Sequence, residues 1–459
     1  MSGTKATGAG AAELLARVDA FDAGQVPDEV REHAARVLAD TIGAAMAGHR
    51  EPEMAALLKA PSVAFGTHGP ADRGAALLVP GAPSAAAGRA ALMNGAAGTF
   101  LELDEGSRPT GHPAVHIVPA ALAAGQVLNS SGRELLDAII LGYEVSARLF
   151  TAYGLRFPLH CHGNLANVGA AVAVARLRGR PCVEPALVAA SFPLLTVWQP
   201  CFEGATVRNT WSGVGAFLGL LANELADSGF TGSVESLEAA FGGLVGEEVN
   251  PSALSDPIDP TRMRIIHNYF KLHSCCASSH SAIDAVLSLP PLDPEEVESI
   301  EVETVSNNLK IDRDPVDAPL SRRFSFGFAV ATALLHGHAD PDAFVADRRV
   351  LELAEKVSVG AAPEFDRVWP DAGPARVTVH LADSDLTALV ENPYGHWRNP
   401  PSPQDLRHKF ERVAGVADPE ALYETITAVD DLPNLEPLVE ALARSRAEEP
   451  RPTSQGAAR

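Results

Sequence analysis

Cysteine is scarce in this sequence. The 459 residues include five cysteines, namely Cys161, Cys182, Cys201, Cys275 and Cys276. A small and odd number of cysteines argues against a disulfide framework and is typical of proteins in a reducing compartment. Residues 1–12 are small and polar with a single lysine, which is unlike the apolar segment of a secretory signal peptide. We therefore expect a cytoplasmic protein.

The sequence also has no long apolar run and has fewer basic than acidic residues. The apolar stretches are rich in Gly and Ala and are interrupted, so none reaches the roughly 20 residues that a membrane span needs. There are 36 Lys and Arg against 58 Asp and Glu, a formal net charge of -22. A nucleic-acid surface requires clustered Lys and Arg. We expect no membrane and no nucleic-acid partner, although a few cations gathered in a pocket can still bind a small anion.

Several catalytic and cofactor signatures are absent. The sequence has no Gly-x-Gly-x-x-Gly, no phosphate loop and no Gly-x-Ser-x-Gly, so nothing supports a nucleotide cofactor or a serine nucleophile. Cysteines in such segments, Cys276 among them, are more often small buried fillers than nucleophiles. Three close pairs could suit zinc, but their spacings match no common zinc module. These pairs are His160/His162, Cys275/Cys276 and His336/His338. We predict neither a metal nor a cofactor.

Hydrophobic periodicity predicts a mainly α protein of two domains, the number expected for this length. The predicted helices of the first half are amphipathic or rich in Ala and Gly, and they lie within residues 11–48, 84–99, 119–128, 134–150, 163–177, 214–225 and 234–241. We expect no strong strand among them. Small side chains on helix faces allow close approach of the helix axes, so this half should be a compact helical body.

The pattern changes near residue 265. Residues 297–305 alternate between apolar and polar side chains, as do residues 376–381, and residues 386–391 can return as a hairpin partner. Helices are expected at 281–289, 328–335, 341–346 and 349–356, which makes 266–399 a small α/β domain. Helical patterns return at 405–413 and 420–429, and the tail after Glu448 should be disordered.

The polar residues most suited to chemistry lie in three segments. Glu102, Asp104 and Glu105 precede Arg108 and His112 in a segment flanked by small-residue helices, and rigidly held loops often carry catalytic groups. The second segment contains His160 and His162 and precedes a helix. The third contains Lys271, Cys275, Cys276 and His280 and lies at the predicted domain junction, a favoured place for a pocket.

This set of residues favours acid–base chemistry. A histidine can exchange a proton near neutral pH, and Lys or Arg can hold a carboxylate and stabilise an enediolate. Each segment alone is equally compatible with a structural role. His112 could cap a turn, His160 could cap a helix, and Lys271 could be a surface charge.

In their order along the chain, these segments resemble the MmgE/PrpD family, which includes 2-methylcitrate dehydratase, cis-aconitate decarboxylase and iminodisuccinate epimerase. The resemblance covers nearly the whole chain, and no single motif is diagnostic. The similar segments are 26–30, 38–43, 101–105 with His112-Pro113, 160–171, 204–209, 229–232, 271–280, 323–326, Asn399-Pro400 and Lys409-Phe410.

The resemblance implies a large all-α domain formed by both chain ends, residues 1–265 and 400–459, with a smaller α/β (α+β) lid domain, 266–399, inserted between them. It also implies a cofactor-independent homodimer with its site between the domains. Carried over by position, the candidate site residues are His112, Lys271, His160, Asp104, Glu102, Arg208, His280 and His162. In this assignment His112 is the leading acid or base, and Lys271 binds a substrate carboxylate. His160 shapes the anion pocket, and Arg208 clamps a second carboxylate.

The sequence departs from the family pattern at several positions. Glu102 and Glu105 stand where aspartate is common, His162 where threonine is usual, Ser274 where proline is usual and Phe328 where tyrosine is frequent. There is also no lysine between Lys59 and Lys271, an interval in which family decarboxylases and several dehydratases use one. Arg208 is the cation nearest in sequence to where the family lysine is expected. An arginine stays charged and cannot donate a proton as lysine can.

The expected function is a lyase that removes a proton next to a carboxylate of a small di- or tricarboxylic acid. A hydro-lyase similar to 2-methylcitrate dehydratase is the first expectation. The second is an epimerase or isomerase of an iminodisuccinate-like dicarboxylate, and the third is a cis-aconitate-type decarboxylase. A non-catalytic relative that binds a carboxylate metabolite is the alternative of another class.

Overall fold

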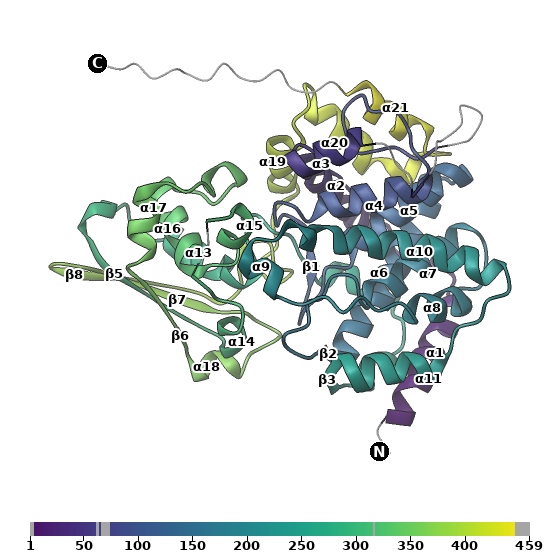
Figure 1. The fold of residues 1–459 in the computed structure, drawn as a ribbon, viewed down its shortest axis with the longest axis horizontal. Coiled ribbons are helices and arrows are strands. Elements are labelled where there is room, and N and C mark those ends of the chain that lie inside the picture. Colours follow the sequence, from purple (N-terminus) through teal and green to yellow (C-terminus); the bar gives the residue numbers. More distant parts are fainter. Residues whose placement is uncertain (1–3, 61–63, 66–73, 315–316, 446–459) are drawn as a thin grey trace.

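The computed structural model describes residues 4–60, 64–65, 74–314 and 317–445. A helical body occupies one side of the molecule, and a smaller part built on a four-stranded sheet projects from it (Figure 1). The predicted mainly α class is confirmed. The expectation for the tail after Glu448 lies outside the described residues.

The helical body is built by the first half of the chain. Its helices are α1 (Thr4–Ala20), α2 (Asp28–Gly48), α3 (Pro52–Lys59), α4 (Ala87–Gly98), α5 (Ala114–Leu128), α6 (Gly132–Ala152), α7 (Ala166–Leu177), α8 (Val183–Ala190), α9 (Gln199–Glu203), α10 (Thr210–Asp227), α11 (Val234–Leu237) and α12 (Ser252–Ser255). The helices α4, α5, α7 and α10 pack together through small residues. A Cβ on Gly95 of α4 would lie 2.8 Å from the Cα of Gly213 in α10, so a side chain there would separate these two helices.

The last helices return to the same body. They are α19 (Pro403–Ala414), α20 (Pro419–Thr427) and α21 (Glu436–Arg444). The helices α19 and α20 pack against α2, and α21 packs against α20 (Figure 1). Phe410 and Ile426 share one hydrophobic core with Leu38 and Ile42 of α2. The two ends of the chain therefore stabilise each other by burying apolar surface between them.

The smaller part has its own hydrophobic core. Its sheet has the order β6 (Val357–Ala361), β5 (Val297–Thr304), β7 (Ala375–Leu381) and β8 (Ser384–Val390). The strand β5 is parallel to β6 and antiparallel to β7, which forms a hairpin with β8. The inward residues Ile300, Val302, Val377 and Val379 are buried with residues of α13 (His280–Leu287), α16 (Phe326–His336) and α17 (Arg348–Ala354). The short helices α14 (Ser306–Leu309), α15 (Pro319–Arg322) and α18 (Pro363–Asp366) occupy the connections.

The structure adds strands that we did not expect. In the first half, β2 (Tyr153–Leu155) pairs with β3 (Gly246–Val249), and β1 (Gly106–Ser107) pairs with β4 (Asn268–Tyr269). The expected helix at 341–346 is only a 3-10 turn at Pro341–Ala343. The expected helix at 234–241 ends at Leu237 and continues as a π-helix. The domain limits at 265 and 399 stay a prediction; the core of the helical body includes Phe270, and the core of the smaller part begins at Cys275.

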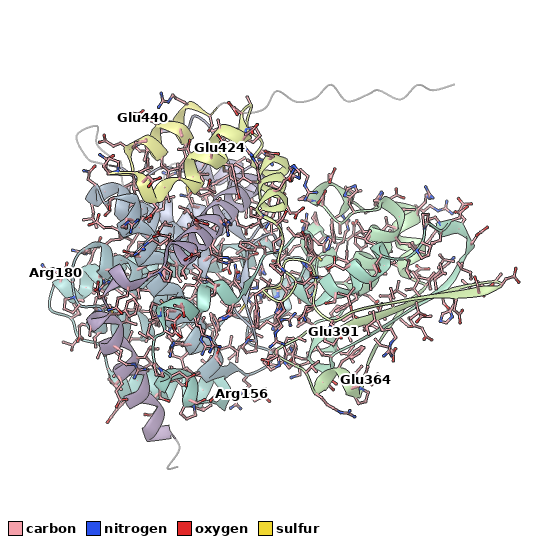
Figure 2. All side chains as sticks on the ribbon, turned by 180° about the vertical axis from the view of Figure 1, so that it is seen from behind. Arg156, Arg180, Glu364, Glu391, Glu424 and Glu440 are labelled. Atoms are coloured by element: carbon pink, nitrogen blue, oxygen red, sulfur yellow. The ribbon has the colours of Figure 1, made fainter. Side chains whose placement is uncertain are left out.

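Charged side chains extend from the outside of both parts, as Arg180, Glu364 and Glu440 show (Figure 2). Among the described residues, no helix combines the length and the apolar character needed to cross a membrane.

Candidate active site

The loop between α4 and α5 is held in place by contacts from distant parts of the chain. Thr99 donates a hydrogen bond to the carbonyl of Asn209 at 3.0 Å, and Ser274 donates one to the carbonyl of Leu101 at 2.6 Å. Lys409 of α19 binds the carbonyl of Leu103 at 2.8 Å. Three regions separated along the sequence thus fix this loop, as expected for a loop that positions reactive groups.

An ionic cluster lies beneath the loop. Lys271 contacts Glu102 at 2.8 Å and Asp104 at 3.3 Å, while Arg208 contacts the other oxygen of Glu102 at 2.5 Å. All four side chains are buried. Glu102 has a φ of 53°, a conformation that a residue other than glycine adopts at a cost. The fold therefore strains the backbone at the residue whose carboxylate joins the two cations.

The charges of this cluster stabilise one another. Burial alone would raise the pKa of Asp104, but the charge of Lys271 and the contact with His112 outweigh it and hold the pKa well below its usual range. Burial alone would lower the pKa of Lys271, but Asp104 and Glu102 raise it above its usual range. Burial is likewise outweighed at Arg208, where Glu102 raises the pKa. Asp104, Lys271 and Arg208 are consequently charged at neutral pH.

His112 connects this cluster to open space. Its Nδ1 lies 2.8 Å from the carbonyl oxygen of Glu105 and 3.0 Å from an oxygen of Asp104. A carbonyl can only accept a hydrogen bond, so Nδ1 carries the proton. In the neutral ring, Nε2 is then the free base, and the side chain is 12% exposed and lines the pocket described below. A proton acceptor is thus oriented by a backbone carbonyl and a buried carboxylate.

Glu105 supports the loop from the other side. One carboxyl oxygen accepts the N–H of Ala114 at 2.8 Å, and the other accepts the hydroxyl of Tyr143 at 2.8 Å. Burial raises the pKa of Glu105 to about 8, despite these two hydrogen bonds. This carboxyl is mostly neutral at pH 7, so of the two acidic side chains nearest His112, Asp104 carries the charge.

The other histidines of the region lie behind His112. The ring of His162 lies 4.9 Å from that of His112 and 4.7 Å from that of His160. Burial and the nearby charge of Arg208 hold the pKa of both His160 and His162 well below the usual value, so both are neutral. His160 also accepts the backbone N–H of His162 and packs against Trp198, with the ring centroids 4.4 Å apart. These rings form the wall behind His112.

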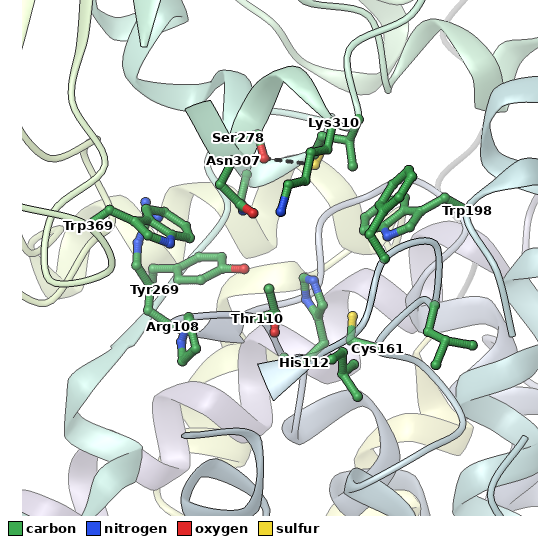
Figure 3. Close-up of a pocket in the computed structure, with 18 residues that line it drawn as sticks. Arg108, Thr110, His112, Cys161, Trp198, Tyr269, Ser278, Asn307, Lys310 and Trp369 are labelled. Atoms are coloured by element: carbon green, nitrogen blue, oxygen red, sulfur yellow. Dashed lines mark hydrogen bonds between the residues drawn. The ribbon is translucent and has the colours of Figure 1, made fainter. Parts of the chain in front are cut away.

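The pocket opens above His112 (Figure 3). It contains about 840 Å³ of empty space, including its open mouth. The polar lining includes Arg108, Thr110, His112, Cys161, Tyr269, Ser278, Asn307 and Lys310, and the apolar lining includes Leu155, Phe157, Leu159, Trp198, Ile311 and Trp369. The helical body and the smaller part that contains the sheet (the sheet domain) both contribute lining residues, since Lys310 follows α14 and Trp369 follows α18. No carboxylate is among these lining residues.

The predicted site residues therefore fall into three groups. His112 lines the pocket, and Glu102, Asp104, His160, His162, Arg208 and Lys271 lie in the buried layer behind it. His280 begins α13 and packs against His273, with ring centroids 5.1 Å apart, in the core of the smaller part. Their roles in catalysis stay predictions.

Sequence reasoning missed most of the pocket lining. Arg108 was visible in the acidic segment, close to His112, but received no role. Lys310, Tyr269 and Trp198 have no local signal, because they reach the pocket only through tertiary packing.

Two groups of described residues bring possible metal ligands together, one at the pocket and one formed by His338, Asp340 and Asp342. A nitrogen of His112, the sulfur of Cys161 and a nitrogen of His162 all lie within 4.8 Å of one another. Burial raises the pKa of the Cys161 thiol above its usual range, and a bound metal ion would lower it again by stabilising the thiolate. The prediction of a metal-free site stands untested.

Comparison with known proteins identifies the class to which this fold and site belong. Residues 12–246 match the MmgE/PrpD N-terminal domain, and residues 273–432 match the MmgE/PrpD C-terminal domain. The chain therefore belongs to the MmgE/PrpD family. The C-terminal match includes both the sheet and the helices α19 and α20.

Particular relatives are cis-aconitate decarboxylases. The protein from Aspergillus terreus is 25% identical over 460 aligned positions, covering 91% of this chain and 92% of that protein. The mouse protein is 26% identical and covers 76% of each chain. The human protein is 27% identical and covers 75% of this chain and 76% of its own.

Proposed function

We propose that this protein is a cofactor-independent lyase that moves a proton at the carbon next to a carboxylate of a small di- or tricarboxylic acid. One observation carries the proposal. His112 is held through Nδ1 by Glu105 and Asp104, so that Nε2 is left for a pocket with cations and no carboxylate in its lining. Membership of the family and the decarboxylase relatives support a lyase.

His112 is the proton carrier in this proposal. Its Nε2 removes a proton from the carbon beside the carboxylate, and the charge of Asp104 stabilises the imidazolium that forms. The negative charge that develops on the substrate carboxylate is stabilised by the cations of the pocket. Lys271 and Arg208 bind the protein's own carboxylates, so we assign them to fixing Asp104 and Glu102 and not to binding substrate.

Dehydration is the first reaction that we propose. After the proton leaves, the bond between the adjacent carbon and its hydroxyl breaks, and protonation of the hydroxyl releases water. An epimerase would instead return the proton to the opposite face of the same carbon. A 2-methylcitrate dehydratase-like activity is therefore proposed first, and an iminodisuccinate-like epimerase second.

Decarboxylation is the second candidate, and it has a specific observation in its favour. Trp198, Phe157 and Ile311 give the pocket an apolar wall. A carboxylate placed against such a wall is poorly solvated, and its loss as uncharged CO2 relieves that cost. In this reaction His112 would start as the imidazolium, stabilised by Asp104, and donate its Nε2 proton to the vacated carbon. The cis-aconitate decarboxylase relatives support this alternative, which the absence of a lysine near Arg208 weakens.

The proposal also covers the oligomeric state and the cellular location of the protein. We propose a cytoplasmic homodimer that binds a small carboxylate and no nucleic acid, on the basis of the family resemblance and the net charge of -22.

The test is proton NMR in D2O with citrate, 2-methylcitrate, cis-aconitate, iminodisuccinate and tartrate. We expect one of these acids to lose the signal of the C–H beside a carboxylate and to form product. Loss of water, loss of CO2 or return of deuterium without net loss distinguishes the three reactions. The His112→Ala variant should lower the rate by about 10²–10⁴-fold, the usual contribution of a general acid or base.

The matched control is His336→Ala, since His336 is an exposed histidine at the end of α16 and should not affect the rate. Binding of an acid without exchange or turnover would contradict the proposal and indicate a non-catalytic carboxylate-binding relative. Equal rates in His112→Ala and the wild-type protein would exclude His112 as the proton carrier.

A further inference from the structure

Arg108 lies at the edge of the pocket, and no hydrogen bond or ion pair of its side chain is seen within the described part of the chain. Its Nε atom is buried and has no hydrogen-bond partner among those residues. Removing a guanidinium from water without a counter-charge is costly. The fold accepts that cost at a position where a ligand can supply the missing charge.

Other buried cations of the described chain have partners. Arg208 and Lys271 contact Glu102, and Lys409 contacts Asp40 at 2.6 Å. Arg323 binds the carbonyl of Ser274 at 2.6 Å. Arg108 differs from these residues in bordering open space.

The position of the Arg108 guanidinium is fixed by its neighbours. Its central carbon lies 4.8 Å from the ring centroid of Trp369 and 6.0 Å from that of Tyr269. Gly373 leaves room for the guanidinium, because a Cβ at that position would overlap it. The two aromatic rings thus contact the planar guanidinium, and the glycine leaves space for it. Its hydrogen-bond donors have no acceptor among the described residues.

Lys310 reaches the same pocket from the sheet domain. Figure 3 shows its amine directed into the pocket, with His112 below and Arg108 beside Trp369. Among the described residues, Lys310 forms no ion pair with a carboxylate. Body and sheet domain therefore each supply one cation, and the proton carrier lies with them in one pocket.

We propose that Arg108 and Lys310 are the specificity-determining residues of the pocket and bind two separate carboxylates of one substrate. Arg108 binds one carboxylate through its planar fork, and Lys310 binds the other as a point charge. This inference rests on the proposed function and names the residues that recognise its substrate. The substrate is an acid with at least two ionised carboxylates, and its monoamide is a poor ligand.

The test is binding, measured by isothermal titration calorimetry, of two diacids and their monoamides: succinate with succinamate, and glutarate with glutaramate. At least one diacid should bind the wild-type protein 10-fold or more tightly than its monoamide. Arg108→Gln and Lys310→Met should each weaken diacid binding by about 10–100-fold, the range of a lost charge-assisted contact, and bring the ratio of the two affinities close to one.

Two further variants separate the role of Arg108 from a loss of folding. Gly373→Ala retains the arginine and displaces its guanidinium, so it should reduce the diacid-to-monoamide ratio in the same direction. Arg348→Gln is the matched control, because Arg348 is an exposed arginine beside Glu352 that does not line this pocket, and the ratio should stay unchanged.

The outcomes separate this proposal from the proposed function. Absence of turnover in D2O with an intact diacid preference would leave the two-carboxylate site standing and reject the lyase. Turnover combined with an unchanged ratio in Arg108→Gln and Lys310→Met would reject the site and leave the lyase standing. Equal binding of diacid and monoamide by the wild-type protein, or binding of neither, would also overturn the site.

Discussion

Two sets of cations belong to the region around His112, one in the buried ionic cluster and one at the pocket, and they differ in what neutralises them. Lys271 and Arg208 are buried against Glu102, and Lys271 also contacts Asp104. Arg108 and Lys310 lie at the pocket with no carboxylate among its lining residues. The same kinds of side chain therefore differ in their contacts: the paired set fixes the loop between α4 and α5, and the pocket set is available to a ligand.

The difference has a physical basis in desolvation. A buried ion pair roughly balances the cost of leaving water, but removal of one partner leaves a charge that nothing compensates. A cation at an open pocket keeps some contact with solvent until a ligand arrives. Substitutions in the two sets should therefore change different measured quantities.

The largest effect is expected from Lys271→Met. The change leaves Glu102 with Arg208 alone and deprives Asp104 of its cation, so two buried carboxylates lose a partner. We expect the free energy of unfolding in urea to fall by about 3–5 kcal/mol. An unchanged unfolding midpoint would contradict the structural role of the paired set.

The second-largest effect is expected from Asp104→Asn, and it is an effect on kcat. His112 keeps its hydrogen bond to the carbonyl of Glu105 but loses the negative charge that stabilises the imidazolium, so kcat should fall by about 10²–10³-fold. Asp284→Asn is the matched control, since Asp284 pairs with His273 at 2.7 Å and neither residue lines the pocket. A similar loss of kcat in both variants would show that the effect is not specific to His112.

Glu105→Gln tests the neutral carboxyl beside the cluster. With a pKa of about 8 when folded and about 4.5 when unfolded, Glu105 binds more protons in the folded state between these values. Its contribution therefore makes the protein less stable as pH rises from about 5 to 8, by up to about 1.4 kcal/mol per pH unit. The difference in free energy of unfolding between wild type and Glu105→Gln, measured by urea titration across this range, should show that slope. A constant difference would contradict the raised pKa.

The smallest effect on stability is expected from Lys310→Met. Its side chain is exposed and has no carboxylate partner among the described residues, so the free energy of unfolding should change by less than about 0.5 kcal/mol. The same urea titration used for Lys271→Met measures this. A loss as large as that of Lys271→Met would remove the distinction between the two sets of cations.

Sequence periodicity predicted much of the fold, and its failures have local causes. The strands β5, β7 and β8 alternate over seven or eight residues and were predicted. The strand β6 was missed because it has five residues and none of them is fully buried, so little alternation is visible. The helix α8 is almost uniformly apolar and contains Pro185, which leaves no 3.6-residue period to recognise.

The candidate site was only partly predictable. The acidic segment was expected to be a loop between helices, and it lies between α4 and α5. The sequence alone could not separate cations that bind substrate from cations that bind the protein's own carboxylates. That distinction depends on tertiary contacts, such as those of Lys271 with Glu102 and of Lys310 with the pocket.

The contact of Lys409 with the carbonyl of Leu103 also has a consequence for biosynthesis. The amine that holds the loop between α4 and α5, and also binds Asp40 of α2, belongs to a helix translated more than 300 residues after that loop. A nascent chain that has not yet released α19 from the ribosome lacks this amine and the apolar face that packs on α2. The order of translation therefore places the anchoring of this loop by Lys409 after the synthesis of α19.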